Sequence, residues 1–78
     1  MRVIAQFPHE QLGITLFSWN QKYILKYELG NLEQTYKIHE LDTAGEAEVR
    51  AVATDAAFVG KVLARFEAMQ TEWNALFA

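Results

Sequence analysis

The hydrophobic pattern of the chain changes its period once, near residue 40. Before this point, β-branched and aromatic residues cluster in short alternating runs separated by turn residues, which is typical of half-buried strands. After it, apolar residues recur every three or four positions, as on one face of a helix. The 78 residues are enough for one small domain. The sequence therefore predicts a single α+β domain over residues 1–78, with a sheet in 1–39 and a helical part in 42–78.

Turn residues divide the first half into four predicted strands, over residues 2–7, 12–19, 22–29 and 32–39. Pro8 ends the first strand because it has no N–H to donate to a neighbour. Asn20-Gln21 and Gly30-Asn31 are expected to form two-residue hairpin turns, since Asn and Gly accept the left-handed backbone conformation that such turns need. Tight hairpins join antiparallel neighbours, so the predicted sheet is an antiparallel meander.

Two helices are predicted in the second half. Asp42 or Thr43 is expected to cap a short helix over residues 44–53, and Thr54 or Asp55 to cap a long helix that ends near residue 77. The long helix carries one broad apolar stripe, made by Phe58, Val59, Val62, Leu63, Phe66, Met69, Trp73, Leu76 and Phe77. Because a sheet needs a cover, the long C-terminal helix is expected to pack on one sheet face.

The two hairpin turns fix which side chains share a face of the sheet. The face expected under the long helix is nearly all apolar and carries Leu12, Ile14, Leu16, Ser18, Tyr23, Leu25, Tyr27, Leu29, Gln34, Tyr36 and Ile38. The opposite face mixes apolar and basic side chains, namely Phe17, Trp19, Ile24, Lys22, Lys26, Lys37 and His39. Glu28 and Glu33 face each other at its far end, which is unfavourable unless Lys26 or Arg2 supplies a cation. A turn longer by one residue would exchange the two faces.

Charge and cysteine content exclude several classes of function. The net charge of −3 argues against indiscriminate binding of phosphate. The chain has no cysteine, which excludes disulfides, thiolate nucleophiles and cysteine zinc sites. No apolar run approaches the ~20 residues that span a bilayer, and the N-terminus lacks the apolar stretch of a signal peptide. We therefore expect a cytoplasmic protein of bacterial type that makes no membrane contact.

Two apolar surfaces are predicted, one on the mixed sheet face at Phe17, Trp19 and Ile24 and one at the end of the long helix at Trp73, Leu76 and Phe77. The sheet patch is rimmed by polar residues, as at many protein–protein contacts. The helix end is expected to overhang, because a helix of ~23 residues is about 35 Å long and an eight-residue strand only roughly 27 Å. These surfaces predict a non-enzymatic interaction protein that forms a homodimer or larger homo-oligomer, or binds an unidentified protein partner.

The alternative interpretation is a module that binds single-stranded nucleic acid. Aromatic side chains with nearby lysines can stack bases and neutralise phosphates. The residues that would do so are Phe17, Trp19, Lys22, Lys26 and Lys37. Nucleic acid ranks below self-association because two glutamates lie among these lysines and the whole chain is acidic. In a third interpretation, the C-terminal segment or residues 42–54 fold over this face and bury it.

Enzymatic activity has the least support from the sequence. His9 is not part of a helical zinc-binding motif, and His39 is most simply a histidine at a strand end, followed by a helix-capping acid. None of the four glycines belongs to a phosphate-binding loop. No catalytic residue, metal site or cofactor is therefore predicted.

Three segments carry a resemblance to known proteins: Phe7-Pro8-His9, residues 17–24 (FSWNQKYI) and residues 33–37 (EQTYK). They resemble a family of short uncharacterised proteins from Bacteroidetes, over most of the chain, which implies a compact cytoplasmic protein and no mechanism. The order of four strands and a helix is also similar to that of single-strand-binding modules of the PUR and positive-cofactor-4 type, which use a curved sheet and dimerise through helix and sheet. That likeness is topological only, so it transfers no functional residue.

Overall fold

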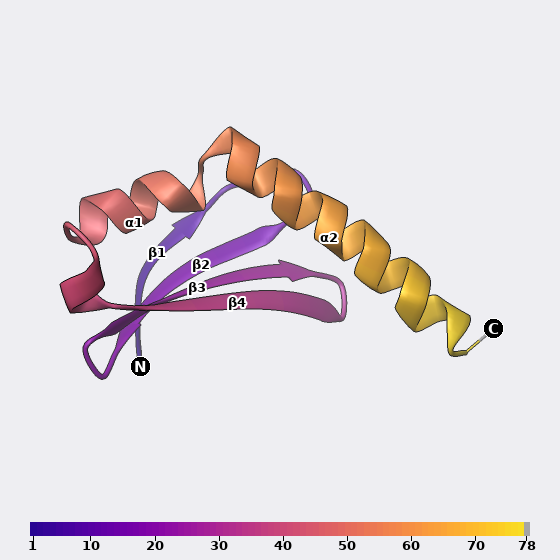
Figure 1. Cartoon of the computed structure of the whole chain (residues 1–78), viewed down its shortest axis with the longest axis horizontal. Coiled ribbons are helices and arrows are strands. Elements are labelled where there is room, and N and C mark those ends of the chain that lie inside the picture. The colour runs from indigo at the N-terminus through magenta and orange to yellow at the C-terminus, as the bar shows by residue number, and fades with distance from the viewer. Residues whose placement is uncertain (78) are drawn as a thin grey trace.

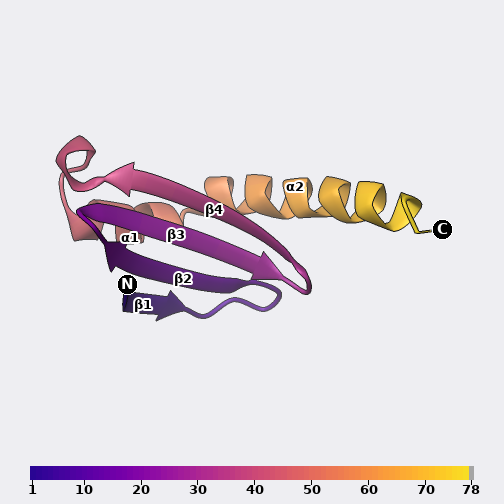
Figure 2. The same ribbon diagram turned by 90° about the horizontal axis from the view of Figure 1, so that it is seen from below.

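The computed structural model describes residues 1–77, and its elements are β1 (Arg2–Phe7), β2 (Gly13–Trp19), β3 (Lys22–Leu29), β4 (Leu32–His39), the 3-10 turn η1 (Glu40–Asp42), α1 (Glu46–Ala53) and α2 (Ala56–Ala75). The strands form one antiparallel sheet in the order β1-β2-β3-β4. Both α-helices lie on the same side of this sheet (Figure 1 and Figure 2). The predicted fold class, a four-stranded antiparallel meander followed by a short helix and a long helix, is confirmed.

The backbone at the two hairpin turns fixes the register of β2, β3 and β4. Asn20 and Gln21 have φ angles of 53° and 65°, as in a type I′ turn, and Gly30 has a φ of 59°. The residue pairs across β2–β3 and β3–β4 are those that the sequence predicts, so both predicted faces are confirmed. The pairing of β1 with β2 shifts between Val3 and Ala5, which the sequence does not indicate.

One hydrophobic core fills the space between the sheet and the two helices. Its buried members are Leu12, Ile14, Leu16, Leu25 and Tyr27 from the sheet side, and Val49, Ala53, Val59, Val62 and Phe66 from the helices. Tyr27 brings a hydroxyl group into this core. Its Oη donates to the main-chain carbonyl oxygen of Ala53 at 2.9 Å, so the buried polar group has a partner and ties β3 to the end of α1.

The long helix α2 begins where the sequence predicts and extends beyond the end of the sheet. Asp55 is its N-cap, and Oδ2 of Asp55 accepts a hydrogen bond from the main-chain N–H of Phe58 at 2.9 Å. The helix ends at Ala75, slightly before the expected position. Figure 2 shows α2 continuing well past the hairpin that joins β3 and β4. The molecule is therefore elongated, with principal extents of 44 × 25 × 20 Å.

The predicted start of the short helix is wrong. α1 begins at Glu46, after an N-cap at Gly45 that has a φ of 131° and no capping side chain. Asp42 is the last residue of η1, and Oγ1 of Thr43 accepts a hydrogen bond from the N–H of Gly45 at 3.0 Å. Thr43 thus stabilises the turn that leaves β4, and the helix forms only after Gly45.

Candidate interaction surfaces

The end of α2 presents three large apolar side chains to solvent. Trp73, Leu76 and Phe77 are 51%, 72% and 72% exposed, and we call them the α2 tail. The rings of Trp73 and Phe77 pack edge to face with their centroids 4.9 Å apart. This contact joins the two aromatic side chains into one contiguous apolar surface.

The α2 tail is exposed because the sheet ends before the helix does. Phe66 is the last fully buried residue of α2, and Met69 is half-buried against the core. The C-terminal end of the helix extends past the β3–β4 hairpin, and no strand lies beneath it there (Figure 1). The predicted overhang is therefore confirmed for Trp73, Leu76 and Phe77, whereas Met69 belongs to the edge of the core.

The other predicted surface is the sheet face turned away from both helices, which we call the open face. Trp19 on this face is 52% exposed, whereas Phe17 is half-buried and Ile24 is only 4% exposed. Ile24 is thus covered by its neighbours and offers little surface of its own. The third interpretation, in which the C-terminal segment or residues 42–54 fold over this face, is wrong because α1 and α2 lie on the opposite side (Figure 1).

The charges of the open face largely neutralise one another at its far end. Lys26 Nζ lies 3.9 Å from Glu28 Oε1 and 3.8 Å from Glu33 Oε2. The predicted role of Lys26 between the two facing glutamates is therefore confirmed. Within residues 1–77, Lys22 and Lys37 form no ion pair, so they are the free cations of this face. Exposed ion pairs contribute little to stability, and here they chiefly reduce the positive potential.

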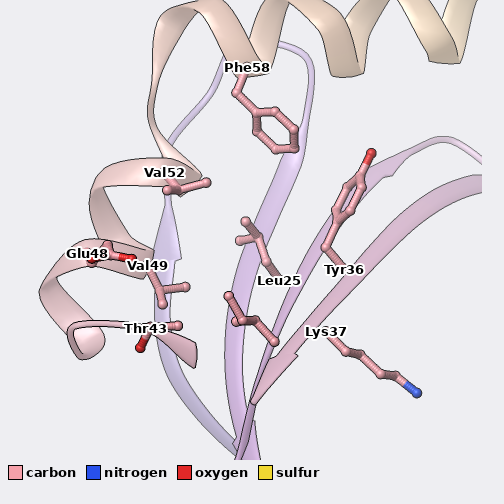
Figure 3. A pocket seen from close by; sticks show the side chains of 9 residues that line it. Leu25, Tyr36, Lys37, Thr43, Glu48, Val49, Val52 and Phe58 are labelled. Atoms are coloured by element: carbon pink, nitrogen blue, oxygen red, sulfur yellow. The ribbon is translucent and has the colours of Figure 1, made fainter. Parts of the chain in front are cut away.

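A half-open hollow of about 270 Å³ lies between α1 and the β4 side of the sheet. Its lining is mostly apolar and consists of Leu25, Tyr36, Lys37, Ile38, Thr43, Glu48, Val49, Val52 and Phe58. Figure 3 shows that the Lys37 side chain extends away from α1 and out of the hollow. Oε2 of Glu48 accepts a hydrogen bond from the N–H of Ala44 at 3.3 Å. The hollow lies just below the ~300–1,000 Å³ of typical small-molecule sites.

Both histidines act as local hydrogen-bond acceptors. Nδ1 of His9 accepts from the main-chain N–H groups of Gln11 and Leu12, at 3.0 and 3.2 Å. Nδ1 of His39 accepts from the N–H of Leu41 at 3.2 Å. In the described part of the chain, no three His, Cys, Asp or Glu side chains come together as a metal-binding group would require. Nor is any helix of residues 1–77 long and apolar enough to cross a membrane.

Sequence reasoning missed three exposed apolar residues, one each in β4, η1 and α1. Ile38, Leu41 and Val52 are 38%, 87% and 44% exposed. Ile38 lies on the sheet face that the register predicts, but it lines the hollow and stays partly exposed there. Leu41 lies in η1, which the sequence does not predict, so no pattern indicated its exposure.

Comparisons of the chain with protein-family models, with curated proteins and with solved structures give no match.

Proposed function

We propose that this chain is a non-enzymatic interaction protein that self-associates through the α2 tail. The observation that carries the proposal is the exposure of Trp73, Leu76 and Phe77 at a helix end with no strand beneath it. Contiguous apolar surface of this kind is typical of protein–protein contact sites. A homodimer is the simplest assembly, because most soluble homo-oligomers have closed two-fold symmetry.

The α2 tail offers a substantial part of the area that a stable contact needs. Trp and Phe side chains each bury about 150–250 Å², so the exposed parts of the α2 tail supply roughly 300–400 Å² per chain. A standard interface removes about 800 Å² from each partner. The α2 tail therefore supplies nearly half of a standard contact, and a neighbouring surface has to supply the remainder.

The open face supports self-association less strongly than the α2 tail does. Its exposed apolar area is reduced because Ile24 is buried and Phe17 is half-buried. Trp19 is the one aromatic residue of the predicted patch that is more than half exposed. The open face is thus the second candidate for the contact between copies.

One observation favours the nucleic-acid alternative: the described part of the chain leaves Trp19 uncovered, near Lys22 and Lys37. Against it, Lys26 is held by two glutamates, and single-strand binding needs a continuous positive groove. Two free lysines on an acidic chain are few for that purpose. Nucleic acid therefore enters as an outcome of the test below.

A matched pair of tryptophan variants tests the proposal. Trp73 lies in the α2 tail and Trp19 on the open face, and they are 51% and 52% exposed. Replacing either tryptophan by serine therefore removes a similar exposed area. We expect the unmodified chain to be dimeric by size exclusion with light scattering, Trp73→Ser to shift it to monomer, and Trp19→Ser to leave it dimeric. Circular dichroism checks that both variants keep the fold.

Three results would overturn the proposal. The first is a monomeric unmodified chain at every protein concentration. The second is dissociation by Trp19→Ser and not by Trp73→Ser, which would place the contact on the open face. The third is salt-sensitive binding of a labelled single-stranded oligonucleotide that Lys22→Glu abolishes, which would support the alternative function.

A cytoplasmic location in a bacterial cell is part of the same proposal. Small secreted domains are commonly held together by disulfides, and this chain of 78 residues has no cysteine. Its stability then depends on its hydrophobic core and on association.

A further inference from the structure

Among the described residues 1–77, the strand β4 forms one edge of the sheet and pairs only with β3. The two-residue turn at Gly30 makes Leu29 and Leu32 the closing pair of the hairpin, which is hydrogen-bonded in such turns. Hydrogen bonding then alternates along β4. The main-chain N–H and C=O groups of Glu33, Thr35 and Lys37 consequently point to the free edge, and within residues 1–77 none of these N–H groups has a recorded partner.

The two edges of the sheet differ in how well they are protected against pairing. The edge strand β1 is six residues long, carries a bulge between Val3 and Ala5, and is followed by Pro8. Bulges and prolines are common devices that prevent the addition of another strand. β4 is eight residues long, has a regular register throughout and contains no proline. Such an edge is a template for another strand.

The side chains along β4 form a self-complementary pattern about Thr35. An acid lies two residues before Thr35 and a base two residues after it, at Glu33 and Lys37. An apolar residue lies three positions away on each side, at Leu32 and Ile38. An antiparallel strand with the same sequence, centred on the same threonine, therefore brings opposite charges together on one face and apolar side chains together on the other.

We infer that β4 pairs antiparallel with β4 of a second copy, with Thr35 opposite Thr35, so that the two sheets become one. Glu33 of each copy then faces Lys37 of the other on the open face, and Leu32 faces Ile38 on the helix side. The occupant of the edge is thus another copy of this chain, selected by charge complementarity. The inference rests on the proposed self-association and gives it a geometry.

Other registers lose this complementarity. A shift by one hydrogen-bonded pair places Thr35 opposite Glu33 or opposite Lys37 and leaves no acid–lysine pair. A shift by two pairs places Glu33 opposite Glu33, or Lys37 opposite Lys37, which is unfavourable for directly facing residues. The charges of β4 therefore select the register centred on Thr35.

The same pairing accounts for the α2 tail. The tail extends past the β3–β4 hairpin (Figure 2), and β4 begins at this hairpin with Leu32. In the proposed pairing, Ile38 of the second copy lies opposite Leu32 of the first copy. Leu41 of the second copy follows its own β4 and lies beyond this pair, at the same end of the joined strands. Ile38 and Leu41 are 38% and 87% exposed in the single chain. Two exposed apolar surfaces, one from each copy, are thus brought to the same end of the joined strands.

Charge-exchanged variants test the register. Lys37→Glu alone and Glu33→Lys alone each place like charges opposite each other twice, so each variant is expected to dimerise at least about tenfold more weakly than the unmodified chain. An equimolar mixture of the two variants restores both opposite-charge pairs and should form heterodimers, observable by native mass spectrometry. Equal dimerisation of all these samples would overturn the inference.

A single cysteine provides a test that does not depend on charge. The chain has no cysteine of its own, so Thr35→Cys introduces one thiol per copy. Opposite residues of a hydrogen-bonded pair have Cα atoms about 5.5 Å apart, inside the 4.4–6.8 Å range of disulfides. Thr35→Cys should therefore form a disulfide-linked dimer under mild oxidation. Glu33→Cys is the control, because its own counterpart would lie four residues along the strand, about 13 Å away.

The outcomes separate this inference from the proposed function. A monomeric unmodified chain overturns both. A dimer that is unaffected by Lys37→Glu, and in which Thr35→Cys links no better than Glu33→Cys, overturns the β4 pairing and leaves the tail contact standing. Efficient linking of Thr35→Cys together with an unchanged dimer in Trp73→Ser supports the β4 pairing and overturns the role of the α2 tail.

Discussion

The side-chain amide of Gln34 donates to the main-chain carbonyl oxygen of Val62 at 2.9 Å, and so connects the edge strand β4 to the middle of α2. Gln34 is 9% exposed, and its Oε1 accepts a hydrogen bond from Tyr36 Oη at 2.7 Å. The guanidinium of Arg65 in turn donates to Tyr36 Oη at 3.1 Å. This chain of polar contacts fixes the position of α2 over β4, and with it the direction in which the α2 tail leaves the sheet.

Replacing Gln34 by leucine should therefore destabilise the fold. The substitution leaves Tyr36 Oη without its acceptor in a partly buried position and removes the link to Val62, at an expected cost of about 1–3 kcal/mol. Urea unfolding at fixed protein concentration measures this change. Gln70→Leu is the matched control, because Gln70 is an exposed residue of α2. Equal stability of the two variants would show that the contact with Val62 does not hold the helix.

The buried hydroxyl of Tyr27 makes stability depend on alkaline pH. Burial, reinforced by the nearby Tyr36 and Asp55, raises the pKa of Tyr27 from 10.0 to about 12. The folded state thus favours the neutral phenol. The contribution of this group to the free energy of unfolding is complete below pH 10 and is lost as the pH rises through about 12. Tyr27→Phe should be less stable at neutral pH by about 1 kcal/mol, because it loses the hydrogen bond to the carbonyl oxygen of Ala53.

The comparison that checks this is the pH profile of the free energy of unfolding. Between pH 10 and about 12, the profile of Tyr27→Phe should be flatter than that of the unmodified chain. Tyr23→Phe keeps the Tyr27 hydroxyl and should retain the steeper loss. Parallel profiles for the unmodified chain and Tyr27→Phe would contradict the assignment of this pH dependence to Tyr27.

The sheet was predictable because its constraints are local. Asn20-Gln21 and Gly30-Asn31 favour two-residue turns, and a two-residue turn fixes the register of the strands that it joins. Once the register is fixed, the two faces follow by alternation, including the facing pair Glu28 and Glu33 with Lys26 beside it. The bulge in β1 was not predictable, because no turn residue marks it.

The surfaces were only partly predictable, because exposure depends on how far one element reaches over another. The length of α2 indicated that Trp73, Leu76 and Phe77 overhang. The burial of Ile24 on the open face, and the exposure of Leu41 in η1, depend on neighbouring side chains that no sequence period specifies. The predicted start of the short helix at residue 44 was wrong for a related reason. Asp42 and Thr43 are good turn residues as well as good caps, and the helix begins only at Glu46.

The caps of the two helices predict a large loss of stability when one aspartate is replaced and a small loss when the other is. Asp55→Ala removes the acceptor for the N–H of Phe58 at the start of α2, so it should destabilise the fold by about 0.5–2 kcal/mol. Asp42 ends η1 and does not cap α1, so Asp42→Ala should change stability by less than about 0.5 kcal/mol. Thermal unfolding of both variants measures the difference. A larger loss for Asp42→Ala would contradict the observed start of α1.

Gly60 lies inside α2, where an added Cβ would meet no atom within 4 Å in the described chain. The glycine therefore has no packing role within one copy, and it costs the helix about 0.5–1 kcal/mol relative to alanine. Gly60→Ala should raise the free energy of unfolding by that amount, and Ala64→Gly, at an exposed site of the same helix, should lower it similarly. All samples need the same protein concentration, because association contributes to apparent stability. If Gly60→Ala instead weakens the dimer, the second copy approaches the α2 backbone at this residue, and the contact between copies extends beyond the α2 tail and β4.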